Sequence, residues 1–273
     1  MLRKKSLGLK SGVNGKTVTR REKVKLPSVT VSIPCYKTKG LLRKVVKLVL
    51  RQDYSQFEVL VICDNDPGLT DEIRDFKDPR LKVIDLEKNI GRYAIDHLVV
   101  TELSNSEYWI PVDSDDWCSP KYISNLVKLA NKTNPDVVFS AQKVYTHGRS
   151  RLHRVKQWDG TDRLQWLAHM SALWKRAYLL EMNLTNPNFR VGWDSIVTSV
   201  PWLTGKIEVN QNPLYHRVRR NNSLTGSKET GFKSEYRERV KTYLIKLWAD
   251  LVKYKEDVDM IKQLLLRSRH AQY

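Results

Sequence analysis

Apolar and polar positions follow two different periods between residues 28 and 146. Short runs rich in β-branched residues predict strands at 28–34, 57–64, 80–86, 107–113 and 136–146. Between them, apolar residues recur at helical spacing in 40–52, 91–103 and 119–132, with Ser119 and Pro120 expected as the N-cap and first-turn residues of the last helix. The alternation predicts an α/β fold with a doubly wound, Rossmann-like, mostly parallel sheet, whose ligands bind at the carboxyl ends of the strands.

The pattern changes in the second half of the chain. Beyond about residue 150 the alternation weakens, and residues 149–220 are rich in Trp, His and Arg. From roughly Ser234 an apolar stripe at helical spacing predicts a long helix, followed by a short one around 261–266. We expect these C-terminal helices to pack against the body of the domain.

Charge narrows the choice of partner. The chain holds 48 Lys and Arg against 30 Asp and Glu, a formal net charge of +18, which favours an anionic partner such as nucleic acid, a phosphorylated headgroup or a nucleotide. Nine of the basic residues lie in residues 1–25 beside one acid. This segment is either a solvated terminus or an arm that contacts a polyanion.

Cysteine usage and hydropathy suggest the compartment. Cys35, Cys63 and Cys118 are an odd set without the spacing of metal ligands, which favours a reducing environment. No apolar run approaches the roughly 18 residues of a membrane span, and the N-terminus lacks the apolar stretch of a signal peptide. We expect a cytoplasmic protein, in the host cytoplasm if it is phage-encoded, with peripheral membrane contact still open.

Three carboxylates stand at the end of the strand predicted at 107–113. The stretch IPVDSDDWCSP contains Asp113, Asp115 and Asp116. Such crowding is unfavourable unless a cation or hydrogen-bond donors neutralise it. Asp113 and Asp115 are one residue apart and can approach one hard divalent ion, Mg²⁺ or Mn²⁺. The alternative is an acidic turn that caps the following helix.

Several segments in order resemble family 2 glycosyltransferases of the GT-A fold. VSIPCYKTKG resembles the family's opening strand and I-P-x-Y, and QDYSQFEVLVICDND resembles its Q-x-Y-x-x-x-E segment and aspartate-ended strand. NIGRYAIDHLV resembles the N-x-G segment, and YWIPVDSDDWCSP the D-x-D-D strand. The match runs from about Val29 to Val138 and implies a nucleoside-diphosphate sugar donor, UDP-linked by preference.

The resemblance implies roles for residues in the first half. Pro34 and Tyr36 would border the nucleotide base, Asp64 would accept a hydrogen bond from it, and Asp113 would approach the ribose. Asp115 would hold the metal that bridges the diphosphate. Where the family commonly has two adjacent aspartates, this chain has Cys63 and Asp64, and we interpret Cys63 as a packing residue. Arg92 would reach a phosphate, or would be an exposed arginine at a helix start.

The second half carries the implied acceptor side. FRVGWDSIV resembles the family's G-E-D segment, so Asp194 would be the general base, or simply a favourable charge at a helix N-terminus. Trp193 stands where an acid is common and would lie beside the acceptor or diphosphate. PLYHRVRRNNS resembles the closing Y-x-R-x-H-x-x-S segment, in which His216 would be a third metal ligand or a core residue. Three arginines there would hold the diphosphate or an anionic acceptor: Arg217, Arg219 and Arg220.

Together these features predict an inverting, metal-dependent glycosyltransferase in four parts. These are a basic arm at 1–27, a nucleotide-sugar half at 28–148, an acceptor half at 149–227 and C-terminal helices at 228–273. The favoured acceptor is a hydroxymethylated base in phage DNA, where Trp158 and Trp166 would stack on a flipped base or else belong to the core. The alternatives are an envelope or capsule enzyme that acts on a polysaccharide or lipid-linked glycan, and a non-enzymatic nucleic-acid-binding protein.

Overall fold

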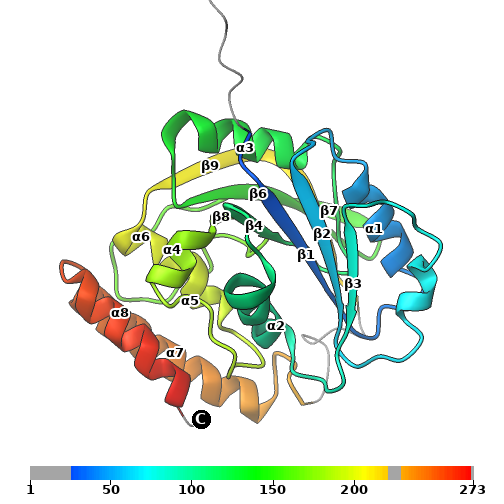
Figure 1. The fold of residues 1–273 in the computed structure, drawn as a ribbon. Helices are drawn as coiled ribbons and strands as arrows, with labels where there is room; N and C mark the ends of the chain where they lie inside the picture. Colours follow the sequence, from blue (N-terminus) through cyan, green and yellow to red (C-terminus); the bar gives the residue numbers. More distant parts are fainter. Residues whose placement is uncertain (1–25, 221–228, 272–273) are drawn as a thin grey trace, which may run out of the picture.

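The computed structural model describes residues 26–220 and 229–271. The basic arm expected at 1–27 lies almost entirely outside the described residues. Within the described part, the chain forms one mixed sheet with helices on both faces (Figure 1). The α/β prediction with a mostly parallel first half is confirmed.

The first half of the chain forms the parallel part of the sheet. Its strands are β1 (Val29–Cys35), β2 (Phe57–Cys63), β3 (Leu81–Asp85) and β4 (Tyr108–Pro111). They lie in the order β3-β2-β1-β4, and each neighbouring pair is parallel. The carboxyl ends of these four strands therefore share one edge of the sheet, as the alternating pattern predicted.

The helices of the first half connect these strands. They are α1 (Leu42–Leu50), the 3₁₀ turn η1 (Thr70–Ile73), α2 (Arg92–Leu98), which continues as the π-helical turn η2 (Val99–Leu103), and α3 (Tyr122–Thr133). The expected cap of α3 is wrong: the helix begins at Tyr122 without a side-chain cap. Ser119 instead lies next to a short strand and donates its amide to the Leu214 carbonyl at 2.8 Å.

The rest of the sheet contains strands that the apolar pattern did not predict. They are β5 (Trp117–Cys118), β7 (Arg149–His153), β8 (Leu173–Lys175) and β9 (Ile207–Val218), beside the predicted β6 (Val137–Thr146). Strand β8 lies between β4 and β6 and is antiparallel to both, whereas β9 is parallel to β6. Strands β5 and β7 pair antiparallel with β9 and β6. The sheet thus extends from the first half of the chain into the second.

Two apolar cores cover the two faces of the sheet. One core joins β1 and alternate residues of β2 to α1 and α3. The other joins the opposite residues of β2 to α2, to α4 (Arg176–Glu181), α5 (Asp194–Ser199) and α6 (Pro201–Thr204), and to the C-terminal helices. Alternation along β2, with Val59 and Val61 on one face and Leu60 and Ile62 on the other, gives the continuous apolar run seen in the sequence.

The C-terminal helices pack on the second core, as expected. Helix α7 (Glu235–Lys253) starts at Ser234, whose hydroxyl accepts the Arg237 amide at 3.2 Å, and α8 (Val258–Arg267) follows with the short turn η3 (Ser268–His270). Both helices lie together at one side of the molecule (Figure 1). Among the described residues, no helix is both long enough and apolar enough to cross a membrane.

Candidate functional site

The site lies where β1, β2 and β4 end together. Hydrogen bonds continue across these ends: the Asp64 amide donates to the Cys35 carbonyl at 2.9 Å, and the Val112 amide to the Ser32 carbonyl at 2.8 Å. The acids that follow β2 and β4 are therefore held at one edge of the sheet. This is the edge at which open α/β sheets bind their ligands.

Asp64 fixes the turn that precedes α2. One carboxylate oxygen accepts the Ile90 amide at 2.7 Å and the other accepts the Gly91 amide at 2.9 Å. The Asn89 side-chain amide donates to the Asp64 carbonyl at 3.0 Å. The N-x-G segment is thus bound to the end of β2. Each carboxylate oxygen has a second lone pair, so these bonds leave acceptor capacity for a ligand.

Asp113 is held between a cation and an imidazole. Its carboxylate pairs with the Arg92 guanidinium, and its second oxygen lies 4.0 Å from His169 Nε2. Burial alone would raise the pKa of Asp113, but the charge of Arg92 and the neighbouring His169 lower it to about 2. Asp113 is therefore ionised at neutral pH. Arg92 has only 20% of its side chain exposed, so the alternative of an exposed arginine is wrong.

The other two aspartates of the cluster have separate partners. Asp115 accepts the Arg220 guanidinium Nε at 2.7 Å. Asp116 is buried, with one oxygen accepting the Tyr215 hydroxyl at 3.0 Å and the other the Val218 amide at 2.8 Å. Burial raises the pKa of both acids, and the neighbouring Asp113 charge adds to each shift. The crowding is therefore compensated by donors from β9 and the residues after it.

Helix α2 joins this cluster to Asp194. Arg92, its first residue, binds Asp113 and also donates from Nε to both oxygens of Asp96, at 3.0 and 2.9 Å. Tyr93, the next residue, donates its hydroxyl to Asp194 at 2.7 Å and accepts the Asp194 amide at 3.2 Å. Two acids 81 positions apart in the chain are thus bound by neighbouring residues of one helix.

His216 lies beside the site with both ring nitrogens engaged. Nε2 is 3.1 Å from the Ser119 hydroxyl and Nδ1 is 3.2 Å from the Tyr145 hydroxyl, while the ring stacks on Trp117 at 3.7 Å between centroids. Burial lowers the pKa of His216 to about 4, with a smaller contribution from the Lys143 charge. This set of partners agrees with the packing interpretation and leaves neither nitrogen free for a metal.

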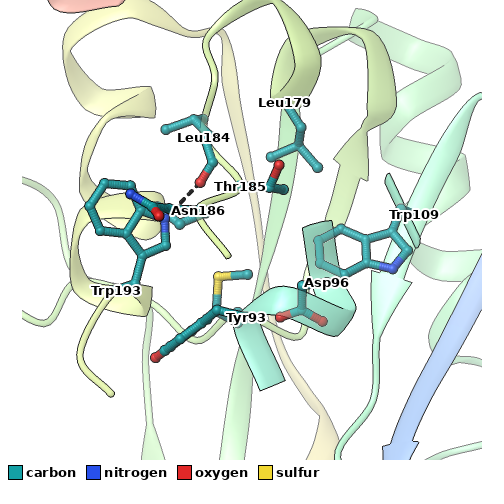
Figure 2. Close-up of a pocket in the computed structure, with 10 residues that line it drawn as sticks. Tyr93, Asp96, Trp109, Leu179, Leu184, Thr185, Asn186 and Trp193 are labelled. Carbon is teal, nitrogen blue, oxygen red and sulfur yellow. Dashed lines mark hydrogen bonds between the residues drawn. The ribbon is translucent and has the colours of Figure 1, made fainter. Parts of the chain in front are cut away.

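Trp193 lies in the core and not beside an acceptor. Its ring stacks on Phe189 and its indole N–H donates to the Leu184 carbonyl at 2.8 Å, the dashed line in Figure 2. The side chain is 1% exposed, so the expected contact with acceptor or diphosphate is corrected. The cavity drawn there, which Tyr93 and Asp96 also line, has a volume of about 10 Å³, room for no more than a water.

The remaining expected residues lie around the strand ends. Pro34 is partly buried near the end of β1, and Tyr36 just beyond it is 41% exposed. Arg217 is partly buried on β9, and its charge lowers the pKa of both Asp113 and His169. Arg219 is exposed and donates its amide to the Tyr145 carbonyl at 3.0 Å.

Three residues that the sequence did not single out complete the site: Tyr93, His169 and Tyr215. Tyr93 was visible only as the residue after Arg92 in the N-x-G segment. Tyr215 accepts the Asp113 amide at 3.2 Å, and its position in the closing segment was a usable signal. His169 had no local signal. Its Nδ1 accepts the Ser171 amide at 3.2 Å, which directs Nε2 towards Asp113.

The side chains at the strand ends supply some, but not all, of the ligands that a divalent ion needs. Asp113 and Asp115 offer carboxylate oxygens one residue apart, the hard ligands that Mg²⁺ or Mn²⁺ prefers. Within residues 26–220 and 229–271, no group of three or more His, Cys, Asp or Glu side chains is arranged to hold a metal. The protein ligands therefore fit an ion whose coordination is completed by other oxygens, such as those of phosphates and water.

Comparison with known proteins finds relatives that are named as glycosyltransferases. Glycosyltransferase GlyA of Streptococcus pneumoniae is 28% identical over 111 residues, 40% of this chain and 16% of the relative. The poly(ribitol-phosphate) β-N-acetylglucosaminyltransferase TarP of Staphylococcus aureus is 26% identical over 130 residues, 46% of this chain and 39% of TarP. The chain thus matches less than half the length of either relative.

The fold also matches solved structures. The crystal structure of S. aureus TarS 1-349 in complex with UDP-GlcNAc superposes with a TM-score of 0.60 and 16% identity, covering 90% of this chain and 93% of that one. At this identity the likeness shows the fold. The model of glycosyl transferase family 2 matches residues 30–196, which is more than half of the chain and includes the ends of β1, β2 and β4. The chain therefore belongs to glycosyl transferase family 2.

Proposed function

We propose that the protein is an inverting glycosyltransferase that moves a sugar from a UDP-linked donor to a hydroxyl group. The observation that carries the proposal is the arrangement around α2. Its first two residues, Arg92 and Tyr93, bind the candidate donor-side acid Asp113 and the candidate base Asp194. A donor at the strand ends and an acceptor beside Asp194 would then meet at one point.

The donor would occupy the edge formed by β1, β2 and β4. Pro34 and Tyr36 would border the base, Asp64 would accept from it, and Asp113 would accept from a ribose hydroxyl. The low pKa of Asp113 keeps it an acceptor at neutral pH. UDP is favoured as the nucleotide because a neighbour of the same fold, TarS, is solved with UDP-GlcNAc.

Asp115 would hold a divalent ion, Mn²⁺ or Mg²⁺, together with donor phosphate oxygens. Its carboxylate is partly exposed and now pairs with Arg220, so metal and arginine would compete for it or share it. When bound, such an ion stabilises charge on a departing diphosphate. Arg220, if displaced from Asp115, would also face the diphosphate. His216 is not part of this ligand set.

Asp194 would act as the general base. The Tyr93 hydroxyl holds one of its oxygens at 2.7 Å, which orients the carboxylate and leaves the other oxygen to accept a proton. The acceptor oxygen would form a bond to the anomeric carbon as the bond from that carbon to the diphosphate breaks, and its proton would pass to Asp194. A single displacement of this kind inverts the configuration and needs no covalent enzyme intermediate.

We infer a glycan as the first candidate acceptor. Relatives at 26–28% identity are named as glycosyltransferases, and TarP is named for a poly(ribitol-phosphate) acceptor. Hydroxymethylated DNA is the second candidate, supported by the formal net charge of +18. Of the two aromatic residues proposed to stack on a base, Trp158 packs edge-to-face on Trp248, whereas Trp166 is 36% exposed. Family membership favours either enzyme over a non-enzymatic binding protein.

The test combines a donor panel with two acceptors. Purified protein is incubated with UDP-sugars and Mn²⁺, with anionic glycan or with DNA containing hydroxymethylpyrimidines, and UDP release and product mass are measured. We expect transfer to the glycan, at least 10³-fold slower in Asp194→Asn. The exposed Asp259→Asn on α8, with a side chain 88% exposed, is the matched control and should keep full activity. Transfer to DNA alone would establish the second candidate, and undiminished transfer by Asp194→Asn would refute the assignment of the base.

A further inference from the structure

Three strands form a basic surface that adjoins the site. Strand β6 pairs with β7 on one side and β9 on the other, so residues in register across the three strands share a face. Arg151 pairs with Val144, which pairs with Arg217. Two guanidinium groups therefore flank one small apolar residue on the same face of the sheet.

The next row repeats this arrangement. Arg149 pairs with Thr146, and Arg219 extends the β9 ladder by donating its amide to the Tyr145 carbonyl at 3.0 Å. Strands lie about 4.8 Å apart and alternate residues about 6.6 Å along a strand, so the four arginines form a lattice of roughly 10 by 7 Å. We call this set the arginine face: Arg149, Arg151, Arg217 and Arg219.

The third row connects the arginine face to the site. His153 pairs with Gln142, which pairs with Tyr215. Tyr215 donates its hydroxyl to Asp116 and accepts the Asp113 amide. The same sheet face thus runs from the aspartate cluster, through Tyr215 and Arg217, to the outer arginines of β7.

The cations of this surface lie close to one another, and Arg217, the nearest of them to the aspartate cluster, also acts on Asp113 and Asp116. Burial lowers the pKa of His153, and the charges of Arg151, Arg219, Arg217 and Lys156 lower it further, so all four cations act electrostatically on the ring. Among residues 26–220 and 229–271, neither Lys156 nor any residue of the arginine face forms a salt bridge. Unpaired cations held this close repel one another, so an anion that bridges them would bind favourably.

An aromatic side chain borders the cations. Trp166 is 36% exposed and meets the His153 ring edge-to-face, with 5.7 Å between centroids. An exposed indole offers a flat apolar surface for the C–H face of a sugar or polyol, while the arginines suit phosphates bidentately. The surface therefore combines recognition of repeated phosphates with recognition of the carbon skeleton between them.

We propose that the arginine face and Trp166 bind an acceptor polymer of phosphodiester-linked sugar or polyol units and guide one of its hydroxyls to Asp194. This inference rests on the proposed glycosyltransferase function and names its acceptor class. The chain of such a polymer would cross the ends of β7 and β9, with successive phosphates on successive rows of arginines.

The experiment measures binding and transfer separately. Calorimetry and transfer assays use a polyol-phosphate polymer, an uncharged glucan of similar length and hydroxymethylated DNA. The variant Arg149→Ser/Arg151→Ser removes two exposed cations of β7, and Trp166→Ala removes the indole. The control Lys246→Ser/Lys255→Ser removes two exposed lysines from α7 and the residues after it. UDP binding with Mn²⁺ is measured for every variant to monitor the donor site and folding.

We expect the double arginine variant to raise the KM and Kd for the polyol-phosphate polymer at least tenfold, with UDP affinity within twofold of the parent chain. Trp166→Ala should raise the same KM about threefold or more, and the lysine control should change neither. Unchanged polymer affinity in the arginine variant, equal binding of the uncharged glucan, or tighter binding of DNA than of the polymer would overturn the inference. Each of these results is compatible with intact UDP binding, so it is distinguishable from failure of the donor-site proposal.

Discussion

The Tyr215 hydroxyl joins two of the three clustered aspartates, which makes its removal an informative perturbation. It donates to Asp116 at 3.0 Å and accepts the Asp113 amide at 3.2 Å, and the side chain is 1% exposed. Tyr215→Phe keeps the ring and its packing. It removes the hydroxyl that donates to one carboxyl oxygen of Asp116 and that accepts the backbone N–H of Asp113.

The magnitude follows from these two losses. At a pH above the raised pKa of Asp116 its carboxyl group is ionised, and a hydrogen bond to a charged group contributes about 2 kcal/mol. An unsatisfied buried amide costs about 1 kcal/mol. We expect Tyr215→Phe to lower the free energy of unfolding by about 3 kcal/mol, equivalent to a fall in Tm of roughly 9 °C for a chain of this size. The altered turn at Asp113 should also weaken UDP binding at least fivefold.

The assay is urea unfolding followed by circular dichroism, with UDP affinity from calorimetry. Tyr122→Phe is the matched control because its buried hydroxyl donates at 2.6 Å to the neutral Ser171 carbonyl, away from the aspartates. The control should lose about 1 kcal/mol and keep UDP affinity. A loss below 1 kcal/mol in Tyr215→Phe, or equal effects of the two variants on stability and UDP binding, would refute the reasoning.

Three further changes test other parts of the site. The pKa of His216 is about 4 in the fold and 6.5 in the unfolded chain, so its neutral form stabilises the fold above pH 6.5 and this stability is lost as the pH falls towards 4. Urea unfolding of His216→Gln should therefore show a smaller loss of unfolding free energy between pH 6.5 and pH 4 than the parent chain. An equal loss in the two proteins would contradict the shift. Tyr93→Phe removes the bond that orients Asp194, so kcat for transfer should fall about tenfold with UDP affinity unchanged, whereas an unaltered kcat would show that the bond is dispensable. Gly91→Ala places a side chain on a residue with a φ of +86°, which residues other than glycine rarely adopt, so we expect thermal denaturation to show a loss of about 2 kcal/mol in the free energy of unfolding. A neutral result would contradict the strain argument.

The elements with strong local periodicity were predictable from sequence. Strands β1, β2, β3, β4 and β6 and helices α1, α2 and α3 lie where apolar spacing placed them. Strands β5 and β8 have only two and three residues, and β9 carries Asn210, Asn212 and Pro213 in place of an apolar alternation. The pairing of β8 and β9 depends on contacts with β4 and β6, and the pairing of β5 depends on contacts with β9. No local pattern encodes these contacts, so the three strands could not be predicted.

The residues of the site were also predictable where a local pattern marks them and not where they depend on contacts between distant positions. Asp113 and Asp115 were recognisable because a turn after a buried strand concentrates them within three positions. The ion pair of Arg92 with Asp113 spans 21 positions, and the bond between Tyr93 and Asp194 spans 101. Such contacts arise only when α2 packs across the end of the sheet. The core position of Trp193 likewise follows from packing on Phe189, which the motif could not show.

The central claim is that the aspartates at the strand ends bind a nucleoside diphosphate together with a divalent ion. Calorimetric titration of UDP into the protein, with and without Mn²⁺, tests it most directly when repeated on Asp115→Asn. We expect UDP to bind the parent chain at least tenfold more tightly with Mn²⁺ than without it, and Asp115→Asn to lose that enhancement. UDP binding that is absent, or that is equally tight with and without Mn²⁺ in both proteins, would contradict the claim.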